Sequence, residues 1–285
     1  MSARDSSQLR AAFAQRIAQE AGITTAGLVH GLAAVPREDF VGAGPWKLMR
    51  PGQIERGYEL TPDDDPRHLY DKVLVALDPA RSLNNGEPSS LLSWLDSLKL
   101  AAGDRFLHVG CGVGYYTAIA ALALEPGGSV LGVEIDEQLA AQAQRNLRPY
   151  AHVSVACGNG IPNGTGPFDA IFVNAGCTDP QAAWLEALNV NGRLLLPLTV
   201  SLPMPGIGGG LMLLVTRHDT GYDARFTTAV GIFHCVGGRT DDGNERLRRS
   251  LMGGKHASVR RLRRDQHAQS DDCWLHGADY CLSMS

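Results

Sequence analysis

The residues best suited to chemistry are three glycines and an acid at the ends of two expected strands. Gly110, Gly112 and Gly114 follow the apolar run 105–109, and Glu134 ends the next apolar run. Glycines at alternate positions permit positive φ and leave no Cβ between the turn and a ligand, while the following helix offers free N–H groups. A carboxylate at the tip of the next strand can accept hydrogen bonds from two ribose hydroxyls. The pattern predicts a site for a nucleoside cofactor.

The glycine spacing narrows the choice of cofactor. A nicotinamide or flavin site would require G-x-G-x-x-G. Counted from Gly110 the third glycine position holds Tyr115, and counted from Gly112 it holds Thr117, so both registers fail. The turn therefore favours S-adenosylmethionine over NAD. The alternative is a tight strand-to-helix turn that binds no ligand.

The elements that must position this turn alternate along the chain. Apolar patterning predicts strands at 105–109, 129–134, 153–157, 168–174 and 192–197, with helices at 115–124, 137–150 and 180–188. Such alternation is typical of an α/β fold with a doubly wound, Rossmann-like sheet. Earlier helices are expected at 8–21, with Ser6 or Ser7 as N-cap and Gly22 as the stop, and at 25–34 and 88–98.

The remaining segments have weaker patterns. Residues 42–66 are rich in Gly, Pro and charge, which predicts a long surface segment. Residues 202–210 predict a hairpin or loop between strands, with strands at 211–217 and 226–236 and a closing strand over 273–282. We divide the chain into an N-terminal helical, substrate-contacting region (1–79), an S-adenosylmethionine-binding core (80–236) and a basic, β-rich C-terminal extension (237–285).

Charge and composition exclude several classes of protein. The chain has 285 residues, a hydrophobic fraction of 44% and a net charge of −4, which argues against a general nucleic-acid or membrane-surface binder. Arginines crowd the segment after Gly237, but no aromatic residues are interleaved with them, so a solvated surface is favoured over a nucleic-acid patch. No apolar signal core or membrane-spanning run is present, so a cytoplasmic protein is expected.

Cysteine and histidine placement predicts no metal site. The six cysteines form no C-x-x-C pair and are expected to be reduced core thiols. Cys273 and Cys281 could face one another across a hairpin, with a disulfide as the less favoured outcome. The histidines show no spaced pair with an acid, so no metal is assigned.

Several motifs resemble a known family. The turn 109–114 with Glu134 is similar to the first two motifs of class I S-adenosylmethionine-dependent methyltransferases. Segments 9–23 and Val35-Pro36-Arg37-Glu38-Asp39-Phe40-Val41 resemble the N-terminal region of protein-L-isoaspartate O-methyltransferases, and segments 157–160, 168–175 and 191–198 resemble that family's later motifs in the right order. The resemblance covers residues 9–217.

The resemblance implies roles for particular residues. The residues it assigns to S-adenosylmethionine are His108, Gly110, Gly112, Gly114, Tyr115, Glu134, Ile135, Gly158, Asn159 and Asn174. His108 stands where the family commonly has an acid and is favoured as a core histidine. Asn159 stands where the family has an aspartate near the adenine amine. The side-chain carbonyl of Asn159 can still accept a hydrogen bond from that amine.

The substrate side departs from the family pattern. The family carries I-S-x-P before the helix that precedes the glycine turn. In 82–90 of this chain Pro88 aligns, but Gly86 replaces the serine, which places recognition of isoaspartate in question. Arg37, in the family's substrate-holding segment, is a candidate for a substrate carboxylate or carbonyl, with a surface salt bridge as the alternative. Gly86 and Pro88 are assigned, together with Arg37, as substrate-binding residues.

Methyl transfer to a carboxylate sets modest chemical demands. The acceptor is already ionised at neutral pH, so the protein must supply alignment and exclusion of water rather than a general base. Neutral donors hold a carboxylate without quenching its nucleophilicity, and the candidates are Asn84, Asn85, Ser89 and Ser90. Alternatively, and with equal weight, the same residues only form a turn and cap the start of a helix.

The sequence thus predicts a carboxyl O-methyltransferase that acts on isoaspartyl or specialised aspartyl carboxylates of peptides or proteins. Two alternatives stay open. One is a methyltransferase for a small molecule or RNA, and the other is a non-catalytic S-adenosylmethionine-binding partner protein. Fold alone does not separate these cases.

Overall fold

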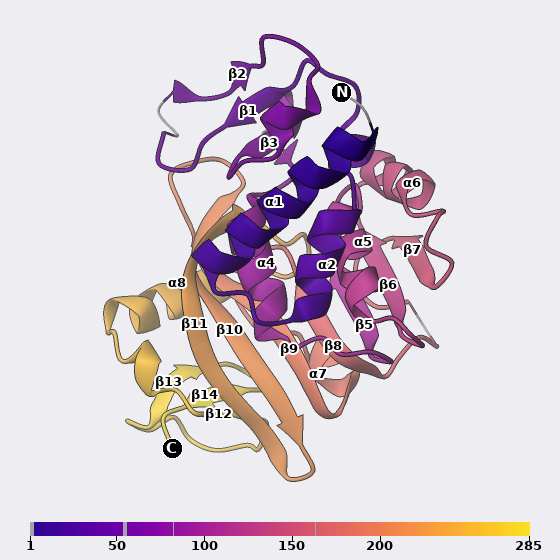
Figure 1. Cartoon of the computed structure of the whole chain (residues 1–285). Helices are drawn as coiled ribbons and strands as arrows, with labels where there is room; N and C mark the ends of the chain where they lie inside the picture. Colours follow the sequence, from indigo (N-terminus) through magenta and orange to yellow (C-terminus); the bar gives the residue numbers. More distant parts are fainter. Residues whose placement is uncertain (1–2, 54–55, 82, 163) are drawn as a thin grey trace. The chain divides into compact units, whose positions relative to one another are not determined.

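The computed structural model describes residues 3–53, 56–81, 83–162 and 164–285. The chain forms two compact units. The first comprises Met1–Asp104 and Cys111–Cys157, and the second comprises Arg105–Gly110 and Gly158–Ser285. Figure 1 shows both units, coloured along the sequence. Our division at residues 79 and 236 stays a prediction.

The first unit is rich in helices. They are α1 (Ala3–Ala21), α2 (Ala26–Ala34), α3 (Glu38–Val41), α4 (Pro88–Ser97), α5 (Tyr115–Ala123) and α6 (Glu137–Asn146). Helix α2 packs against α1 and α5, and α1 also packs against α4, as Figure 1 shows. Phe13, Ala14 and Ile17 lie on the buried face of α1. None of the described helices combines the length and apolar character needed to cross a membrane.

The expected ends of the N-terminal helices were partly wrong. Helix α1 begins at Ala3, so neither Ser6 nor Ser7 is its N-cap. Gly22 does end it, because its φ of +64° is a left-handed conformation that glycine adopts without strain. Helix α2 follows Thr25 as expected and ends before the extended Val35.

The segment 42–66, predicted to be a long surface segment, contributes two strands to a small antiparallel sheet. Its strands are β1 (Lys47–Met49), β2 (Glu59–Leu60), β3 (Leu74–Asp78) and β4 (Leu83–Asn84), in the order β2-β1-β3-β4. Short 3-10 helices at Pro66–Leu69 and Pro79–Arg81 connect them. Trp46, Leu69, Val73 and Val75 form its core. The strands themselves were not predicted, because a few apolar residues, scattered among glycines, prolines and charged residues, are enough to form strands this short.

The first unit also contains the parallel strands β6 (Ser129–Glu134) and β7 (Val153–Cys157), which match the expected ranges. Their register pairs Val130 with Val153 and Glu134 with Cys157. Glu134 is thus the last residue of its strand, as expected for an acid at a strand tip.

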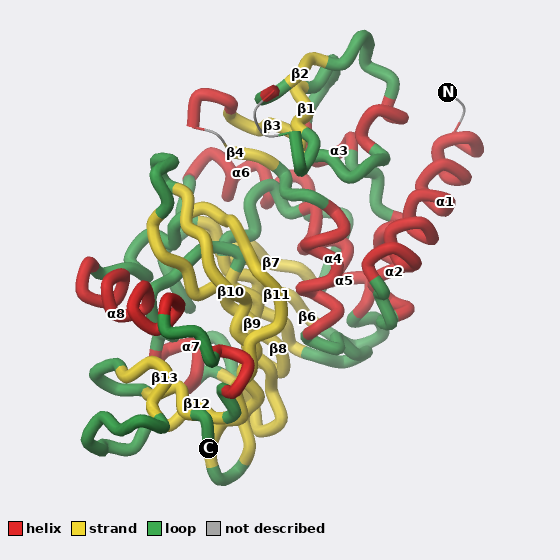
Figure 2. The backbone as a smooth tube through the Cα atoms, turned by 90° about the vertical axis from the view of Figure 1, so that its left-hand side faces the viewer, coloured by secondary structure: helices red, strands yellow, loops and turns green. Residues whose placement is uncertain are grey.

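The second unit is built on a mixed sheet. Its strands are β5 (Arg105–Val109), β8 (Phe168–Val173), β9 (Leu188–Ser201), β10 (Ile207–His218), β11 (Gly221–Phe233), β12 (Arg261–Arg263), β13 (Cys273–His276) and β14 (Cys281–Ser283), in the order β13-β14-β12-β11-β10-β9-β8-β5. The pairings of β8 with β5 and with β9 are parallel, and the others are antiparallel. Helices α7 (Ala182–Glu186) and α8 (Asp241–Met252) and a 3-10 turn at His256–Ser258 complete it. Figure 2 shows α8 beside the end of the sheet that carries β12 and β13.

The long hairpin of β9 and β10 extends beyond the expected strands. Strand β10 includes Gly208 and Gly210, which we had placed in a hairpin or loop between strands. A Cβ on Gly210 would lie 2.0 Å from the carbonyl oxygen of Leu198, and one on Gly208 would lie 2.4 Å from Thr199 Oγ1. Glycine is present here because the neighbouring strand approaches closely, and not because the chain turns.

The basic C-terminal segment is folded, and two of its arginines pair with acids of the preceding segment. Thr240 caps α8 by accepting a hydrogen bond from the backbone N–H of Gly243. Arg246 pairs with Asp179 at 2.6 Å, and Arg264 pairs with Glu186 at 2.9 Å. The expected single closing strand over 273–282 is instead the hairpin of β13 and β14.

Candidate cofactor and acceptor site

The glycine turn of the first unit is tied to the acid at the tip of β6. The backbone N–H of Gly112 donates to Glu134 Oε2 at 2.8 Å, and the backbone N–H of Asp136 donates to Glu134 Oε1 at 3.1 Å. Glu134 is 7% exposed. Each carboxylate oxygen has two acceptor positions, so both can still accept a ligand hydroxyl. The two residues that sequence spacing picked out are therefore in contact.

The turn leaves room for a ligand at one glycine and is tightly packed at another. Gly112 has a φ of +57°, and a Cβ placed on it would meet nothing within 4 Å. Gly114 has a φ of +92°, and a Cβ there would lie 2.7 Å from Leu147 Cδ1. Gly112 thus borders open space, whereas Gly114 lets α5 begin against α6. The open side and the acceptor pair on Glu134 suit a ribose-bearing ligand.

The residues after Glu134 complete this corner. Ile135 is 43% exposed, which is unusual for a large apolar side chain at the end of a buried strand. Asp136 caps α6 by accepting from the N–H groups of Gln138 and Leu139, at 3.0 and 2.9 Å. Asp136 also pairs with Arg81 at 2.6 Å. Sequence reasoning missed this pair, because the two residues lie far apart in the chain.

Five of the other residues assigned to the cofactor, His108, Gly110, Gly158, Asn159 and Asn174, lie in the second unit. Gly110 follows β5 with a φ of +75°, and its carbonyl accepts from Asn174 Nδ2 at 3.4 Å. Asn159 is exposed, and its side chain lies so near Gly237 that a Cβ there would approach Asn159 Nδ2 to 2.4 Å. Gly158 beside it has a φ of +157°. The assignment of these residues to the cofactor stays a prediction.

His108 is embedded in the sheet of the second unit. It is 1% exposed, and its ring stacks on Phe172 with centroids 5.2 Å apart. Burial lowers the pKa of its imidazole to about 3, so the ring is neutral at physiological pH. This environment is that of a core histidine, the interpretation we favoured from sequence.

Arg37 is fully buried and joins several segments of the first unit. Its guanidinium donates to the carbonyls of Leu69, Val73 and Gly86 at 3.0, 3.0 and 2.8 Å, and its Nε donates to Asn85 Oδ1 at 3.1 Å. Neither the substrate contact nor the surface salt bridge is what this structure shows for Arg37. It holds the loop that precedes α4.

The start of α4 already binds a carboxylate. Glu87 accepts from the backbone N–H groups of Ser89 and Ser90 at 2.8 and 3.0 Å, and both serine hydroxyls donate to it. Burial alone would raise the pKa of Glu87, but the hydrogen bonds from Ser89 and Ser90 outweigh it and keep the pKa below its usual value. Pro88 occupies the first helical position, where it needs no hydrogen-bond partner. Glu87 therefore turns back onto its own helix.

The loop before Glu87 is also ordered by local hydrogen bonds. Asn84 Oδ1 accepts from the N–H of Gly86 at 2.8 Å, and the Tyr116 hydroxyl donates to the carbonyl of Gly86 at 3.2 Å. Gly86 has a φ of +69°, a conformation unfavourable for serine. Ser82, at the start of this loop, lies outside the described residues. Among the described residues, the Nδ2 group of Asn85 has no hydrogen-bond partner.

Tyr115 starts α5 but is 1% exposed. Its ring packs edge-on against Phe40 and Tyr116, with centroids 5.5 and 5.0 Å apart, and the Arg37 guanidinium lies 5.7 Å from its centroid. Burial raises the pKa of its hydroxyl well above the usual value. Its position fits support of the turn rather than polar contact with a ligand.

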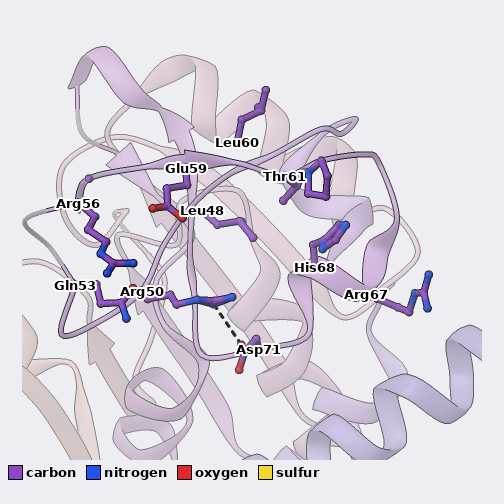
Figure 3. A pocket seen from close by; sticks show the side chains of 12 residues that line it. Leu48, Arg50, Gln53, Arg56, Glu59, Leu60, Thr61, Arg67, His68 and Asp71 are labelled. Atoms are coloured by element: carbon purple, nitrogen blue, oxygen red, sulfur yellow. Dashed lines mark hydrogen bonds and ion pairs between the residues drawn. The ribbon is translucent and has the colours of Figure 1, made fainter.

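A separate pocket of about 280 Å³ opens in the N-terminal sheet of the first unit. Its charged lining includes Arg50, Arg56, Glu59, Arg67 and Asp71, and Figure 3 shows Arg50 turned toward Asp71, with which it pairs at 3.3 Å. None of its lining residues is one that the sequence assigned to cofactor or acceptor.

Comparison with known proteins decides the family. The model of the protein-L-isoaspartate(D-aspartate) O-methyltransferase family matches residues 82–203. The chain is 30% identical over 246 residues to protein-L-isoaspartate O-methyltransferase 2 of Marinobacter nauticus, covering 80% of this chain and 95% of that protein. The chain belongs to the protein-L-isoaspartate O-methyltransferase family. The resemblance inferred from the VPR segment and the glycine turn is thereby confirmed.

Other relatives of the family match with similar identity. The protein-L-isoaspartate O-methyltransferase of Rhodopseudomonas palustris strain BisB5 is 29% identical over 220 residues, which are 73% of this chain and 87% of that protein. The enzyme of that name from Methanococcus aeolicus is 30% identical over 141 residues, with 47% of this chain and 64% of the relative covered.

Solved structures support the family fold. A protein-L-isoaspartate O-methyltransferase aligns with a TM-score of 0.64 at 19% identity, over 85% of this chain and 69% of its own. A Plasmodium falciparum protein of the same description, in complex with S-adenosyl-L-homocysteine, aligns with a TM-score of 0.59 at 16% identity, over 79% of this chain and 97% of its own. The expected α/β methyltransferase class with C-terminal strands is confirmed.

Proposed function

We propose that this protein is an S-adenosylmethionine-dependent carboxyl O-methyltransferase that acts on isoaspartyl or specialised aspartyl carboxylates of peptides or proteins. The observation that carries the proposal is the contact between the Gly112 N–H and the Glu134 carboxylate, beside open space at Gly112. Membership of the family supports the same activity.

The residues present fit S-adenosylmethionine. Glu134 offers acceptor positions for ribose hydroxyls, and Gly112 leaves the approach to the turn free of side chains. Ile135 adds an exposed apolar surface beside them. When bound, the cofactor supplies an electrophilic methyl group on a sulfonium. The chain itself must orient the acceptor carboxylate and exclude water.

In the loop that precedes α4, Asn85 is the residue that we still propose to bind the substrate carboxylate. Its Oδ1 is fixed by Arg37 Nε, which orients the amide and leaves its Nδ2 as a donor. A neutral donor suits the acceptor, because it holds a carboxylate without neutralising it. Asn84, Ser89 and Ser90 are engaged with Gly86 and Glu87, so we assign them the support of the loop.

The acceptor can be tested with matched peptides. Purified protein is incubated with methyl-labelled S-adenosylmethionine and an isoaspartyl peptide or its aspartyl twin, and base-labile label is counted. Label on the isoaspartyl peptide only supports a repair-type specificity, and label on an aspartyl peptide supports a specialised acceptor. Cofactor binding with no label on any carboxylate peptide would overturn the proposal in favour of another acceptor or a binding role. Gly112→Arg serves as the negative control.

A further inference from the structure

The C-terminal hairpin gathers four potential metal ligands. One ligand atom from each of His267, Cys273, His276 and Cys281 lies within 4.8 Å of the others. All four residues belong to the second unit, and no part of the proposed methyl transfer uses them. We propose that these four residues bind one zinc ion, which has a structural role.

Strand geometry explains why residues at this spacing meet. In a regular strand Cys273 and His276, three positions apart, would point to opposite faces. The register of β13 and β14 pairs Cys273 with Ser283 and Leu275 with Leu282, so one extra residue, Trp274, is inserted in β13. A bulge of this kind reverses the alternation and places Cys273 and His276 on one face. His276 is also directly opposite Cys281.

The fourth ligand comes from the loop after β12 and is held in position. His267 Nδ1 lies 3.0 Å from the carbonyl oxygen of Asp265, which makes Nδ1 the protonated nitrogen, and its Nε2 lies 3.6 Å from Cys273 Sγ. A backbone partner on one ring nitrogen fixes the tautomer that leaves the other free to bind metal. The ring packs edge-on against that of His276, with centroids 4.9 Å apart.

Two further observations point to a ligand. His276 Nδ1 is buried and has no hydrogen-bond partner among the described residues. Such an unsatisfied nitrogen is costly, and we assign it as the ligand atom of this ring. The N–H and hydroxyl of Ser270 approach Cys273 Sγ at 3.4 and 3.5 Å, which suits a thiolate. Both cysteines are free thiols in this structure.

The donor set selects the metal and its role. Two sulfur and two nitrogen ligands in a compact group are typical of tetrahedral zinc, and a site whose four positions are all filled by protein is structural. Tetrahedral zinc places its ligand atoms about 3.3–3.8 Å apart, so any pair near the 4.8 Å limit of this cluster must move closer by about 1 Å when the metal binds. Binding releases the two thiol protons to solvent and involves no oxidation or reduction.

The position of the cluster indicates what the metal stabilises. The cluster lies at the edge of the sheet, where β12, β13 and β14 are each only three or four residues long. Metal binding to a small element adds directly to its folding free energy. The sequence pattern H-x-x-x-x-x-C-x-x-H-x-x-x-x-C over 267–281 is therefore assigned a metal, where sequence analysis assigned none.

Metal content and cobalt substitution of the full chain test the proposal. We expect about one zinc per chain after gel filtration, and visible absorption of tetrahedral cobalt with a thiolate charge-transfer band when stripped protein is titrated with Co²⁺. Cys273→Ser and His276→Asn should lower zinc content at least ~10-fold. Cys157→Ser and His218→Asn, which change exposed or partly exposed residues outside the cluster, should retain it.

Two results would overturn the proposal. One is wild-type protein that carries less than about a tenth of a zinc per chain and shows no cobalt bands, which would exclude a site of ordinary structural affinity. The other is a Cys273–Cys281 disulfide found by non-reducing peptide mapping of freshly purified protein. Because the cobalt titration uses wild-type protein, a variant that fails to fold does not affect it. Methyl transfer is not a readout, so failure of the proposed function leaves this test intact.

Discussion

Glu134 Oε2 accepts a hydrogen bond from the backbone N–H of Gly112 at 2.8 Å, across an interval of 22 residues in the chain. The acid that we propose binds the ribose of the cofactor also fixes the turn that we propose approaches the rest of that cofactor. Loss of this carboxylate should therefore affect cofactor affinity twice, once through the ligand and once through the turn.

Glu134→Gln should separate these contributions. Glutamine has one carbonyl oxygen, so it retains one backbone hydrogen bond and loses the charge that strengthens the others. We expect affinity for S-adenosylmethionine to fall by ~10-fold or more, as measured by isothermal titration calorimetry. Glu137→Gln, a change at the exposed first residue of α6, is the control. Equal affinity in both variants would remove Glu134 from the site.

Gly112→Arg should abolish cofactor binding without unfolding the protein. The space beside Gly112 is open, so the cost to folding is limited to the strain of a positive φ, about 1–2 kcal/mol. Gly103→Arg is a matched control, because Gly103 has a φ of +87° and a Cβ placed on it would also meet nothing within 4 Å. Both variants should lose similar thermal stability, and only Gly112→Arg should lose binding. Retained binding in Gly112→Arg would contradict the proposed site.

Arg37→Lys should destabilise the fold. Lysine cannot make the planar set of contacts with Leu69, Val73, Gly86 and Asn85, so buried acceptors lose partners, at about 1–3 kcal/mol each. Urea unfolding should show a loss of at least ~2 kcal/mol. Arg67→Lys changes an exposed pair and should leave the urea unfolding curve close to that of the wild type. A variant of ordinary stability with only a raised KM for peptide would instead support direct substrate contact.

Asn85→Asp tests whether the Asn85 amide donates a hydrogen bond to the substrate carboxylate that accepts the methyl group. Aspartate still accepts from Arg37 Nε but replaces the Nδ2 donor with an acceptor, which repels a substrate carboxylate. We expect kcat/KM for the methyl-accepting peptide to fall at least ~10-fold, with S-adenosylmethionine affinity and thermal stability retained. Unchanged peptide kinetics would place the acceptor elsewhere.

The acid side of the stability profile should depend on Asp96. Burial raises the pKa of its carboxyl, but hydrogen bonds from Lys99, Thr25 and Thr24 outweigh it and lower the pKa from 3.8 to about 2. The pKa is lower in the folded state, so its stabilisation is fully present above the unfolded value near 4 and is lost as pH falls toward 2. Asp96→Asn should lower the melting temperature at pH 7 and flatten the decline below pH 4. Parallel curves for wild type and variant would contradict this, with the exposed Asp279→Asn as control.

Sequence patterning predicted the elements near the turn closely, because their periodicity is strong. Strands 105–109, 129–134 and 153–157 match the structure to the residue. It failed where contacts are non-local or the elements are short. The strands within 42–66 and the glycines of β10 depend on what packs beside them. The secondary-structure propensity of a local segment does not indicate which parts of the chain will pack beside it.

The candidate site shows the same division. Gly112 and Glu134 were predicted to belong to one site, because their chemistry and spacing are local to one strand-turn-helix unit and the next strand, and the structure shows them in contact. The buried, loop-holding role of Arg37 was not predicted, because its partners at 69, 73, 85 and 86 come together only when the chain folds. The metal cluster was missed because a bulge at Trp274 changes which side chains share a face, and bulges leave little trace in composition.

The contacts of Arg37 also bear on how this loop can change over time. Of its four partners, three are backbone carbonyls, which every residue type provides. The path of the loop is thus largely independent of its side chains. Glycine at 86 in place of the family's serine leaves that anchorage intact, so the acceptor preference of this protein is free to diverge while the scaffold around it stays fixed.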